Sequence, residues 1–467
     1  MDNSYFEYLY DQYILGLYTP TDDIYDKNIF VENSIPHKYS VIEERIDMTN
    51  IECYSVDPDG CEDADDAFSI YIENGKIMLA IHIADPTEYI NIESTQWKTI
   101  QNRIVTRYPS NRKPFHMMSY DIMEKSSLMA NKYGDVKNAV TILTEIDDNT
   151  YMPKGNIKLL YTIIKVSKKN ALSYDDACNK TEEIVDLQMG LKISKALLDS
   201  RAERTTGTIL NDVRTSIISY RGEYSVLENV SYTEKNMKEM IAEFAIFANS
   251  FIGKYLKLNF DEFGIFRTCS ANDLLNNVSD TISGNELLEK IITNGIRAEY
   301  INHAQRHDLV GSDEYTHFTS PIRRASDCIC HYLLKYIFLK VTNHALDKPF
   351  SIKELEDLSN KCIGVSKKMK KIQYKDTKFR LLQVMSNMLY NKTHIDIIYY
   401  ITSCKNGFLN LIICNIENYN VYMSYTVCVN GEYIYNTKDK YTISITCVNY
   451  PKKFDTGSIP ELDRIFT

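Results

Sequence analysis

The spacing of apolar and polar residues divides the chain into a β-rich first third, a helical middle and a β-rich tail. Alternating or continuous apolar runs predict a strand, a hairpin and two further strands over residues 51–56, 67–84, 136–146 and 157–166. Asn74 and Gly75 supply the turn signal of the hairpin. Apolar residues at helical spacing predict helices over residues 183–204 and 234–256, and two more helices are predicted over residues 320–340 and 353–392. Together these elements predict an α+β fold.

The two ends of the chain differ from this middle part. Residues 1–45 are aromatic and acidic, with Pro20 and Pro36 as breaks, and are expected to form an ordered arm that is too short for a domain. From about residue 394 to 450, short β-like runs alternate with Asn and Gly turns. We therefore divide the chain into an arm, a large domain and a small β-rich domain, over residues 1–45, 46–392 and 393–467.

Composition predicts an intracellular protein. The 467 residues are 44% hydrophobic, which allows a large core, and the net charge of −10 lowers the expectation of non-specific nucleic-acid binding without excluding a basic channel. The 11 cysteines form no CxxC pair, so we expect reduced thiols, no zinc site and no disulfide framework. The N-terminus does not resemble a signal peptide, and no apolar run reaches the ~18 residues of a membrane span. We expect a soluble, cytoplasmic and monomeric protein without a membrane segment.

The most unusual short stretch is the acidic loop 55-SVDPDGCEDADDAF-68. The strand predictions place Asp57 at the end of one strand and Asp66 at the start of the next, with Pro58 and Gly60 shaping the loop between them. The six acidic residues of the loop are Asp57, Asp59, Glu62, Asp63, Asp65 and Asp66. Like charges this close repel one another and resist burial. A solvated acidic turn is the ordinary interpretation, and a calcium loop is a second one, although the EF-hand spacing is absent.

A metal site is the third interpretation of this loop. The four carboxylates that can converge on one point are those of Asp57, Asp63, Asp65 and Asp66. Asp59 and Glu62 are then expected to face solvent. A set of carboxylates without His or Cys favours Mg²⁺, with Mn²⁺ as a substitute, over zinc. Two such ions about 4 Å apart form the usual clamp for in-line displacement at phosphorus.

A second motif, 317-HFTSPIRRASDCICH-331, opens a predicted helix with Ser320 as its N-cap. A helix N-terminus presents free N–H groups and partial positive charge, and Arg323 adds a planar fork suited to a phosphate. Asp327 and His331 follow Arg323 in steps of four residues, so all three are predicted to share a helix face on which Asp327 holds Arg323, His331 or both. A surface helix with ordinary ion pairs is the alternative.

Together the two motifs resemble the catalytic RNB domain of the ribonuclease II and ribonuclease R family. The stretches that carry the resemblance are SVDPDGCEDADDAFSI, LAIHIADPTEYI and HFTSPIRRASD. The family's acidic motif has Asp at relative positions 0, 6, 8 and 9, and all four are present here. The likeness runs from roughly Arg45 to about residue 392. It implies an RNB-type domain, in which a mixed β-sheet and helices surround an RNA channel, followed by the small β-rich region.

The resemblance implies a metal-dependent 3′-to-5′ exoribonuclease that hydrolyses single-stranded RNA to nucleoside 5′-monophosphates by a two-metal-ion mechanism. It implies that the four aspartates hold Mg²⁺ and position the attacking water, with Asp65 and Asp63 catalytic and the loss of Asp65 most damaging. Arg323 is implied to stabilise charge on the phosphate in the transition state, a role that electrostatics also predicts. A catalytically silent RNA-binding protein and a scaffold protein stay open as alternatives, although retention of all four aspartates and Arg323 favours the enzyme.

The resemblance also implies further contacts with RNA. Tyr108, in 103-RIVTRYPS-110, is similar to a tyrosine that stacks on a base at the 5′ side of the bound nucleotides, and Tyr174, in 170-NALSYDDA-177, is similar to one near the 3′-terminal nucleotide. A partly buried core tyrosine is the alternative for each. Glu243 resembles a glutamate that contacts the terminal nucleotides, with an exposed helix glutamate as the alternative. The other residues predicted to bind RNA are Ser320, Arg324, Lys367 and Lys370.

The two lysines belong to the basic segment 366–380, which lines an RNA path or is a solvated helix face. The chain departs from the family pattern at 116-HMMS-119, Cys269, Ala325 and Tyr332, and none of these changes removes a metal ligand. Only about 45 residues precede the likeness, so the N-terminal cold-shock OB domains of bacterial members are expected to be absent and RNA binding to be weaker and more salt-sensitive. The tail is either a diverged OB-like barrel or a simple sheet.

Overall fold

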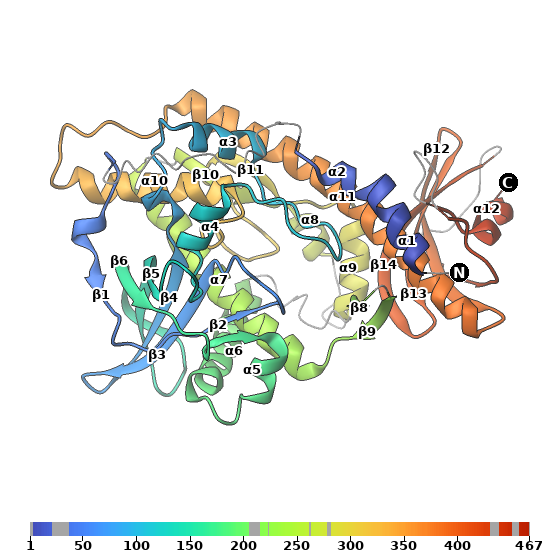
Figure 1. The fold of residues 1–467 in the computed structure, drawn as a ribbon, viewed down its shortest axis with the longest axis horizontal. Helices are drawn as coiled ribbons and strands as arrows, with labels where there is room; N and C mark the ends of the chain where they lie inside the picture. The colour runs from blue at the N-terminus through green and yellow to red at the C-terminus, as the bar shows by residue number, and fades with distance from the viewer. Residues whose placement is uncertain are drawn as a thin grey trace.

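The structure is a computed structural model that describes residues 3–20, 37–204, 215–222, 224–260, 263–277, 282–429, 439–450 and 457–466. Figure 1 shows a large body of helices and strands at one end and a small β-rich part at the other. Helix α11 (Ile352–Asn391), drawn in orange, is 40 residues long and runs from one part to the other. The fold is α+β, as predicted.

A five-stranded sheet with the order β1-β6-β5-β4-β3 supports the large body. Its strands are β1 (Ile46–Asp47), β3 (Asp66–Glu73), β4 (Lys76–Ala84), β5 (Val136–Ile146) and β6 (Pro153–Lys165). All neighbours are antiparallel except β1, which runs parallel to β6. The predicted hairpin is β3–β4, and Asn74 and Gly75 adopt positive φ values of 50° and 75°, as a tight hairpin turn requires. The strand predicted over 51–56 is confirmed only at its end, as β2 (Ser55–Asp57), which pairs in parallel with β7 (Ala171–Ser173).

All four predicted helices are present, as α6 (Val185–Arg204), α7 (Tyr232–Asn259), α10 (Ala325–Lys340) and α11. Every residue from Ala325 to Lys335 is buried, so α10 is a core helix rather than a surface helix. The shorter helices of the body are α3 (Thr95–Arg103), α4 (Tyr120–Ser126), α5 (Tyr174–Asn179), α8 (Asn272–Leu275) and α9 (Gly284–Thr293). Two strand pairs that the sequence did not predict are β8 (Ser216–Arg221) with β9 (Tyr224–Asn229) and β10 (Phe263–Thr268) with β11 (Glu299–His303).

Helix α10 begins five residues later than the sequence predicted, so Ser320 is not its N-cap. Residues 321–323 form a turn, and Arg324 is extended and forms an isolated bridge with Val105. The backbone N–H of Ile322 donates to Asp65 Oδ1 at 2.8 Å. These long-range bonds override the local helix-start signal, because they fix the backbone before Ala325 in non-helical conformations. The predicted helix face shared by Arg323, Asp327 and His331 is therefore wrong for Arg323, which precedes the helix.

The first described segment of the N-terminal arm, residues 3–20, is helical and packs on α11. It comprises α1 (Asn3–Tyr10), the single turn η1 (Asp11–Leu15) and α2 (Gly16–Tyr18). Its buried side chains form a small core with those of α11, made of Phe6, Leu9, Tyr10, Ile14, Tyr18, Met369, Ile372 and Phe379. Residues 21–36 of the predicted arm lie outside the described residues.

The tail forms an antiparallel sheet with the order β14-β13-β12-β15, which confirms the β-rich prediction. Its elements are β12 (Ile395–Lys405), β13 (Phe408–Ile416), β14 (Tyr419–Cys428), β15 (Tyr441–Ile445) and helix α12 (Pro460–Phe466). An OB fold is a five-stranded barrel, and the described part of the tail has four strands, so that assignment stays a prediction. Leu381 and Met385 of α11 belong to the core of this sheet, so the division at residue 392 stays a prediction too. Among the described helices, none is both long and apolar enough to cross a bilayer.

Candidate active site

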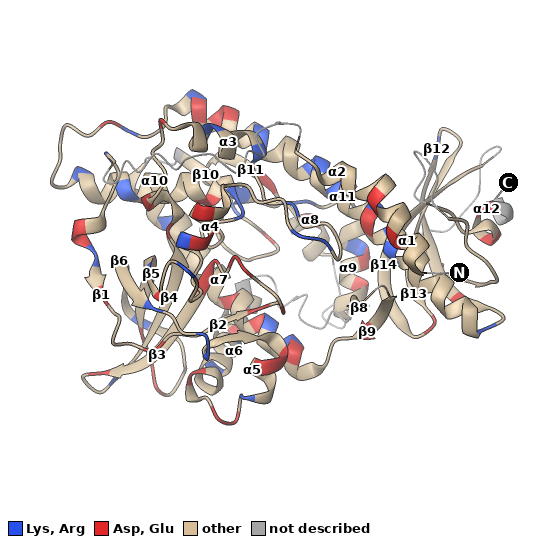
Figure 2. Cartoon of the chain, in the orientation of Figure 1, with Lys and Arg blue, Asp and Glu red and all other residues tan. Residues whose placement is uncertain are grey.

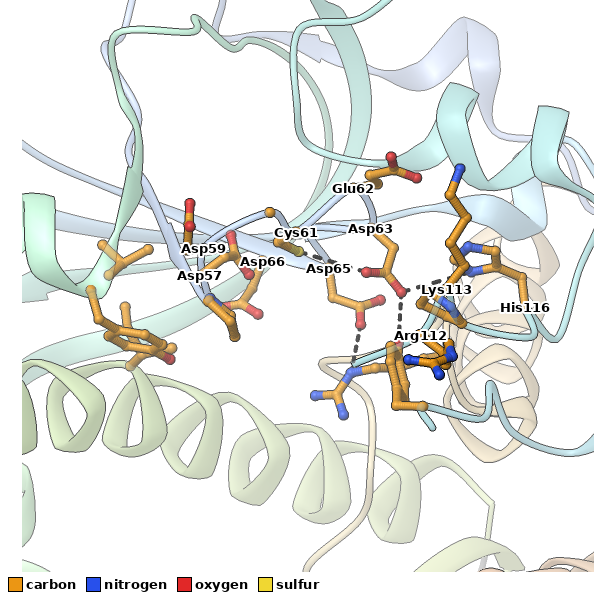
Figure 3. Close-up of a pocket in the computed structure, with 18 of the residues that line it drawn as sticks. Asp57, Asp59, Cys61, Glu62, Asp63, Asp65, Asp66, Arg112, Lys113 and His116 are labelled. Atoms are coloured by element: carbon orange, nitrogen blue, oxygen red, sulfur yellow. Dashed lines mark hydrogen bonds and ion pairs between the residues drawn. The ribbon is translucent and has the colours of Figure 1, made fainter. Parts of the chain in front are cut away.

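Strands β2 and β3 hold the acidic loop at its two ends. Strand β2 ends at Asp57 and β3 begins at Asp66, as predicted, and Gly60 between them adopts a φ of 73°. Figure 2 shows the acidic residues of this loop gathered near α7. The aspartates predicted to bind metal, Asp57, Asp63, Asp65 and Asp66, all line one cavity of about 830 Å³. Figure 3 shows their carboxylates in this cavity, so the four are not splayed into solvent.

The carboxylates differ in their partners. Asp65 is 4% exposed and accepts from the backbone N–H of Ile322 and, at 3.0 Å, from Arg323 Nε. Asp63 accepts from the Tyr108 hydroxyl at 2.6 Å and lies 3.9 Å from His116 Nδ1. The buried Oδ2 of Asp57 has no hydrogen-bond partner among the described residues. The cavity therefore holds carboxylate oxygens that the protein itself leaves without full compensation.

Asp59 and Glu62 are exposed, as the sequence predicted, so the loop divides into a buried and a solvated group of acids. Burial raises the pKa of Asp57 to about 7, and repulsion from Asp65 and Asp63 adds to the rise. Burial likewise raises the pKa of Asp66 to about 7, with the charge of Asp57 as the next cause. The pKa of Asp65 rises to about 8 through burial, against which the charge of Arg323 acts. The site favours protons or a cation on these carboxylates.

The four aspartates have the ligand chemistry that a hard divalent cation needs, but their carboxylates are not arranged around one metal position. In the described ranges, no group of three or more His, Cys, Asp or Glu side chains is arranged to hold a metal ion. The predicted convergence of four carboxylates on one point is therefore wrong for this conformation, because Asp65 turns toward Arg323 and Asp63 toward Tyr108. The all-oxygen donor set and the unpartnered Oδ2 of Asp57 nevertheless suit Mg²⁺ or Mn²⁺.

Arg323 reaches the cavity from a segment 258 positions away from Asp65 in the sequence. Its Nη2 donates to Ser320 Oγ at 2.8 Å, and its side chain is 46% exposed, so part of the guanidinium stays accessible to a ligand. Asp327 does not bond Arg323. It accepts instead from the Ser320 backbone N–H and from Arg324 Nη2, both at 2.8 Å. Ser320 and Asp327 thus fix the turn that presents Arg323, and Arg324 is not among the residues that line the cavity.

Both predicted stacking tyrosines line the same cavity. Tyr108 is 41% exposed and lies outside the core clusters of the described residues, so the alternative of a partly buried core tyrosine is wrong for it. Tyr174 is half-buried at the start of α5 and packs against the core, so its ring is only partly available. The loop after Tyr108 contributes residues that sequence reasoning did not assign to the site, namely Asn111, Arg112, Lys113 and His116. The basic run directly after Tyr108 was the signal that could have identified them.

The structure does not bring Glu243, Lys367 and Lys370 to the acidic cavity. Glu243 is 3% exposed and pairs with Arg201, so the alternative of an exposed helix glutamate is wrong. Both residues line a different cavity, which residues of β6, α6 and α7 surround. Lys367 and Lys370 line a third cavity between α11 and β11. The structure thus assembles the aspartates, Arg323 and the two tyrosines, and separates them from Glu243, Lys367 and Lys370.

Comparison with known proteins gives the family of this arrangement. A family model described as the RNB domain matches residues 45–340. Exoribonuclease 2 of Buchnera aphidicola is 28% identical over 350 residues, which are 64% of this chain and 51% of that protein. The chain spans between 38% and 52% of the length of curated relatives that it matches.

Solved structures share the fold. Mycoplasma genitalium RNase R, in complex with ribose-methylated single-stranded RNA, has a TM-score of 0.68 at 17% identity over 87% of this chain and 70% of that one. Yeast Ssd1, described as a pseudonuclease, has a TM-score of 0.64 at 15% identity over 83% of this chain and 50% of that one. The match of the family model covers more than half of the chain, and the chain therefore belongs to the RNB domain family.

Proposed function

We propose that the protein is a metal-dependent exoribonuclease that hydrolyses single-stranded RNA from its 3′ end to nucleoside 5′-monophosphates. The observation that carries the proposal is the contact of Arg323 with Asp65 at one end of a cavity lined by four aspartates. A cation held by carboxylates on one side and a guanidinium on the other are the two groups that a phosphate in displacement needs. The acidic loop and Arg323 come from segments far apart in the sequence, so this meeting is a property of the fold.

The metal ligands in this proposal are Asp57, Asp63, Asp65 and Asp66. Bound Mg²⁺ would supply a Lewis acid for the phosphate and a more acidic bound water. The Arg323 side chain is 46% exposed, so its guanidinium could donate to the phosphate of a bound RNA. Asp65, which now accepts from Arg323, would then have the metal cation as a partner of opposite charge. The Tyr108 hydroxyl donates to Asp63 in this conformation. If Asp63 bound metal instead, the Tyr108 ring would be free to turn toward a base.

The walls of the cavity support a strand without sequence preference. Tyr108 and Tyr174 offer aromatic faces, and stacking is worth about 1–3 kcal/mol per base for any base. Lys113, on the wall that carries Tyr108, offers positive charge for backbone phosphates, whereas its neighbour Arg112 is paired with Glu7 and Asp11. These contacts recognise single strands, because a base must leave its duplex partner to stack on a side chain.

A catalytically silent RNA-binding protein is the second candidate. The fold likeness to a pseudonuclease and the lack of a finished metal cage in the described residues favour it. The retained four aspartates and Arg323 favour the enzyme, because unneutralised carboxylates at this density carry a cost that a silent protein has no reason to keep.

Comparison of linear and circular RNA of one sequence tests whether degradation requires a free RNA end. With Mg²⁺, we expect the linear RNA to be degraded and the circular RNA, which has no 3′ end, to persist. The released products should be nucleoside 5′-monophosphates, identified by chromatography against 5′- and 3′-monophosphate standards. Cleavage of the circle would show an endonuclease, and loss of neither RNA would favour the silent RNA-binding protein.

A further inference from the structure

A second charged cavity lies apart from the acidic one, among α9, β11 and α11, and has a volume of about 530 Å³. Its basic lining residues come from three separate segments of the chain and are Arg267, Arg297, Lys367, Lys370 and Lys371. Glu299 of β11 is the one acidic residue that lines it. We refer to this site as the basic cavity.

The charge of the basic cavity is left largely uncompensated. Glu299 pairs with Lys367 at 3.3 Å. In the part of the chain that the structure describes, the other four basic side chains have no carboxylate within ion-pair distance. Burial and repulsion from Arg267 and Arg297 lower the pKa of Lys370. Four cations without a carboxylate partner among the described residues, in a protein with a net charge of −10, make the cavity a site for an anion with several negative charges.

The lining also carries aromatic and apolar surface. Tyr374, 57% exposed, follows Lys370 and Lys371 on the same face of α11, and Ile291 and Ile296 form part of the wall. Positive charge together with an exposed ring is the combination that binds single-stranded nucleic acid, since phosphates meet the cations and a base meets the ring. Inorganic phosphate or a lone sugar phosphate would use the cations only.

Arg267 connects the basic cavity to the segment that presents Arg323. The guanidinium of Arg267 lies 4.5 Å from the centre of the Tyr300 ring. The Tyr300 hydroxyl bonds His317 Nδ1 at 2.7 Å and accepts from Ser326 Oγ at 3.3 Å. Contacts through Tyr300 therefore connect a wall residue of the basic cavity to residues 317–326, the segment that carries Arg323 of the acidic cavity.

We propose that the basic cavity binds the phosphodiester backbone of single-stranded RNA on the 5′ side of the nucleotides held in the acidic cavity. The proposal rests on the proposed function for the identity of the ligand, and it adds a second binding site formed by α9, β10, β11 and α11. An RNA too short to leave the acidic cavity does not reach this site, so its contribution depends on the length of the strand.

Helix α11 offers a matched pair of variants for the test. Lys370 and Lys371 line the basic cavity, whereas Lys368 and Lys375 are exposed on the same helix and do not line it. The double variants K370E/K371E and K368E/K375E lie on the same helix and change the net charge equally, so the comparison controls for the effect of net charge. Both are made in the full chain with Asp65→Asn, which keeps the RNA intact, and binding of a labelled RNA is followed by fluorescence anisotropy.

We expect K370E/K371E to weaken binding of an RNA of about 25 nucleotides by about tenfold, and to lower the slope of log affinity against log salt by about 1.4 for two lost phosphate contacts. K368E/K375E should stay within about twofold of the parent, and binding of a tetranucleotide should change in neither variant. Equal loss in the two double variants, or an equal loss for the tetranucleotide, would overturn the proposal, as would failure of the parent to bind the long RNA.

A third arm separates the strand from a mononucleotide. Adenosine 5′-monophosphate is titrated as a competitor, and we expect it to displace the long RNA equally from both double variants. If it binds the parent and K368E/K375E but not K370E/K371E, and the long RNA binds all three alike, the cavity is a nucleotide site and the proposal is wrong. Because degradation plays no part in these measurements, an inactive wild-type protein would refute the proposed function and leave this result standing.

Discussion

Replacement of Asp57 by Asn should stabilise the metal-free protein and remove much of its response to Mg²⁺. The folded protein raises the pKa of Asp57 from an ordinary value of 3.8 to about 7, mainly through burial and then through the charges of Asp65 and Asp63. A carboxyl group whose pKa is raised on folding destabilises the folded state above its unfolded pKa, and the penalty grows as the pH rises toward the folded pKa. An amide of the same shape carries no such charge.

The size of the effect follows from the shift. About three pKa units at 1.36 kcal/mol each give an upper limit of about 4 kcal/mol at pH 8. Because Asp57 is only half-buried and neighbouring carboxylates share the same protons, we expect a gain of ~1–2 kcal/mol for Asp57→Asn. The gain should shrink as the pH falls from 8 toward 4, where the carboxyl group of the folded protein is protonated.

Urea denaturation in EDTA at pH 8 and at pH 5 measures this difference, and a repeat in Mg²⁺ measures the metal response. The matched control is Asp59→Asn, which removes the same charge from an exposed position of the same loop and should change stability by less than about 0.5 kcal/mol. Mg²⁺ should stabilise the wild type and the Asp59 variant more than the Asp57 variant. Equal stability of the two variants in EDTA, or an equal response of both to Mg²⁺, would refute the reasoning.

Three further substitutions test other parts of the site. Arg323→Lys keeps the charge and loses the guanidinium fork, so we expect the rate of RNA shortening to fall about 100-fold or more with binding changed little; a fall in affinity alone would contradict this role. Tyr108→Ala should weaken RNA binding by ~1–3 kcal/mol in anisotropy measurements, and Tyr108→Phe, which keeps the ring, should not. Asp376 accepts from the hydroxyls of Tyr10 and Tyr18 at 2.9 and 2.7 Å and from the Ser110 backbone N–H at 3.0 Å, so it ties the N-terminal arm to the loop that carries Tyr108. Asp376→Asn should therefore speed limited proteolysis of the arm and cost about 1–3 kcal/mol in denaturation; an unchanged proteolysis rate would show that the arm does not depend on this carboxylate.

The parts of the fold with strong local signals could be predicted from the sequence. Asn-Gly fixes the β3–β4 turn by its preference for positive φ, and the helix predicted over 353–392 matches α11 to within one residue at each end. The gathering of the four aspartates in one cavity was also predictable, because all four lie between Asp57 and Asp66. Strands β2 and β3 hold the two ends of this loop.

Contacts between distant segments explain what could not be predicted. The start of α10 depends on Asp65, which bonds the Ile322 N–H from 257 positions away, and no local capping rule contains that information. Glu243 reads as an exposed helix residue until α6 brings Arg201 against it. The lysines of the basic segment 366–380 can be identified from the sequence. Arg267 and Arg297 cannot be assigned to the same cavity in this way, because β10 and the loop after α9 bring them there only in the folded protein.

Degradation of 5′-labelled single-stranded RNA by the wild type and by Asp65→Asn tests the proposed activity most directly. With Mg²⁺, the wild type should shorten the RNA progressively from its 3′ end to a short residual oligonucleotide, and the variant should bind the RNA without shortening it. Equal shortening by both proteins would contradict the role of Asp65. Binding without shortening by the wild type, in Mg²⁺ and in Mn²⁺, would contradict the enzyme and favour the silent RNA-binding protein.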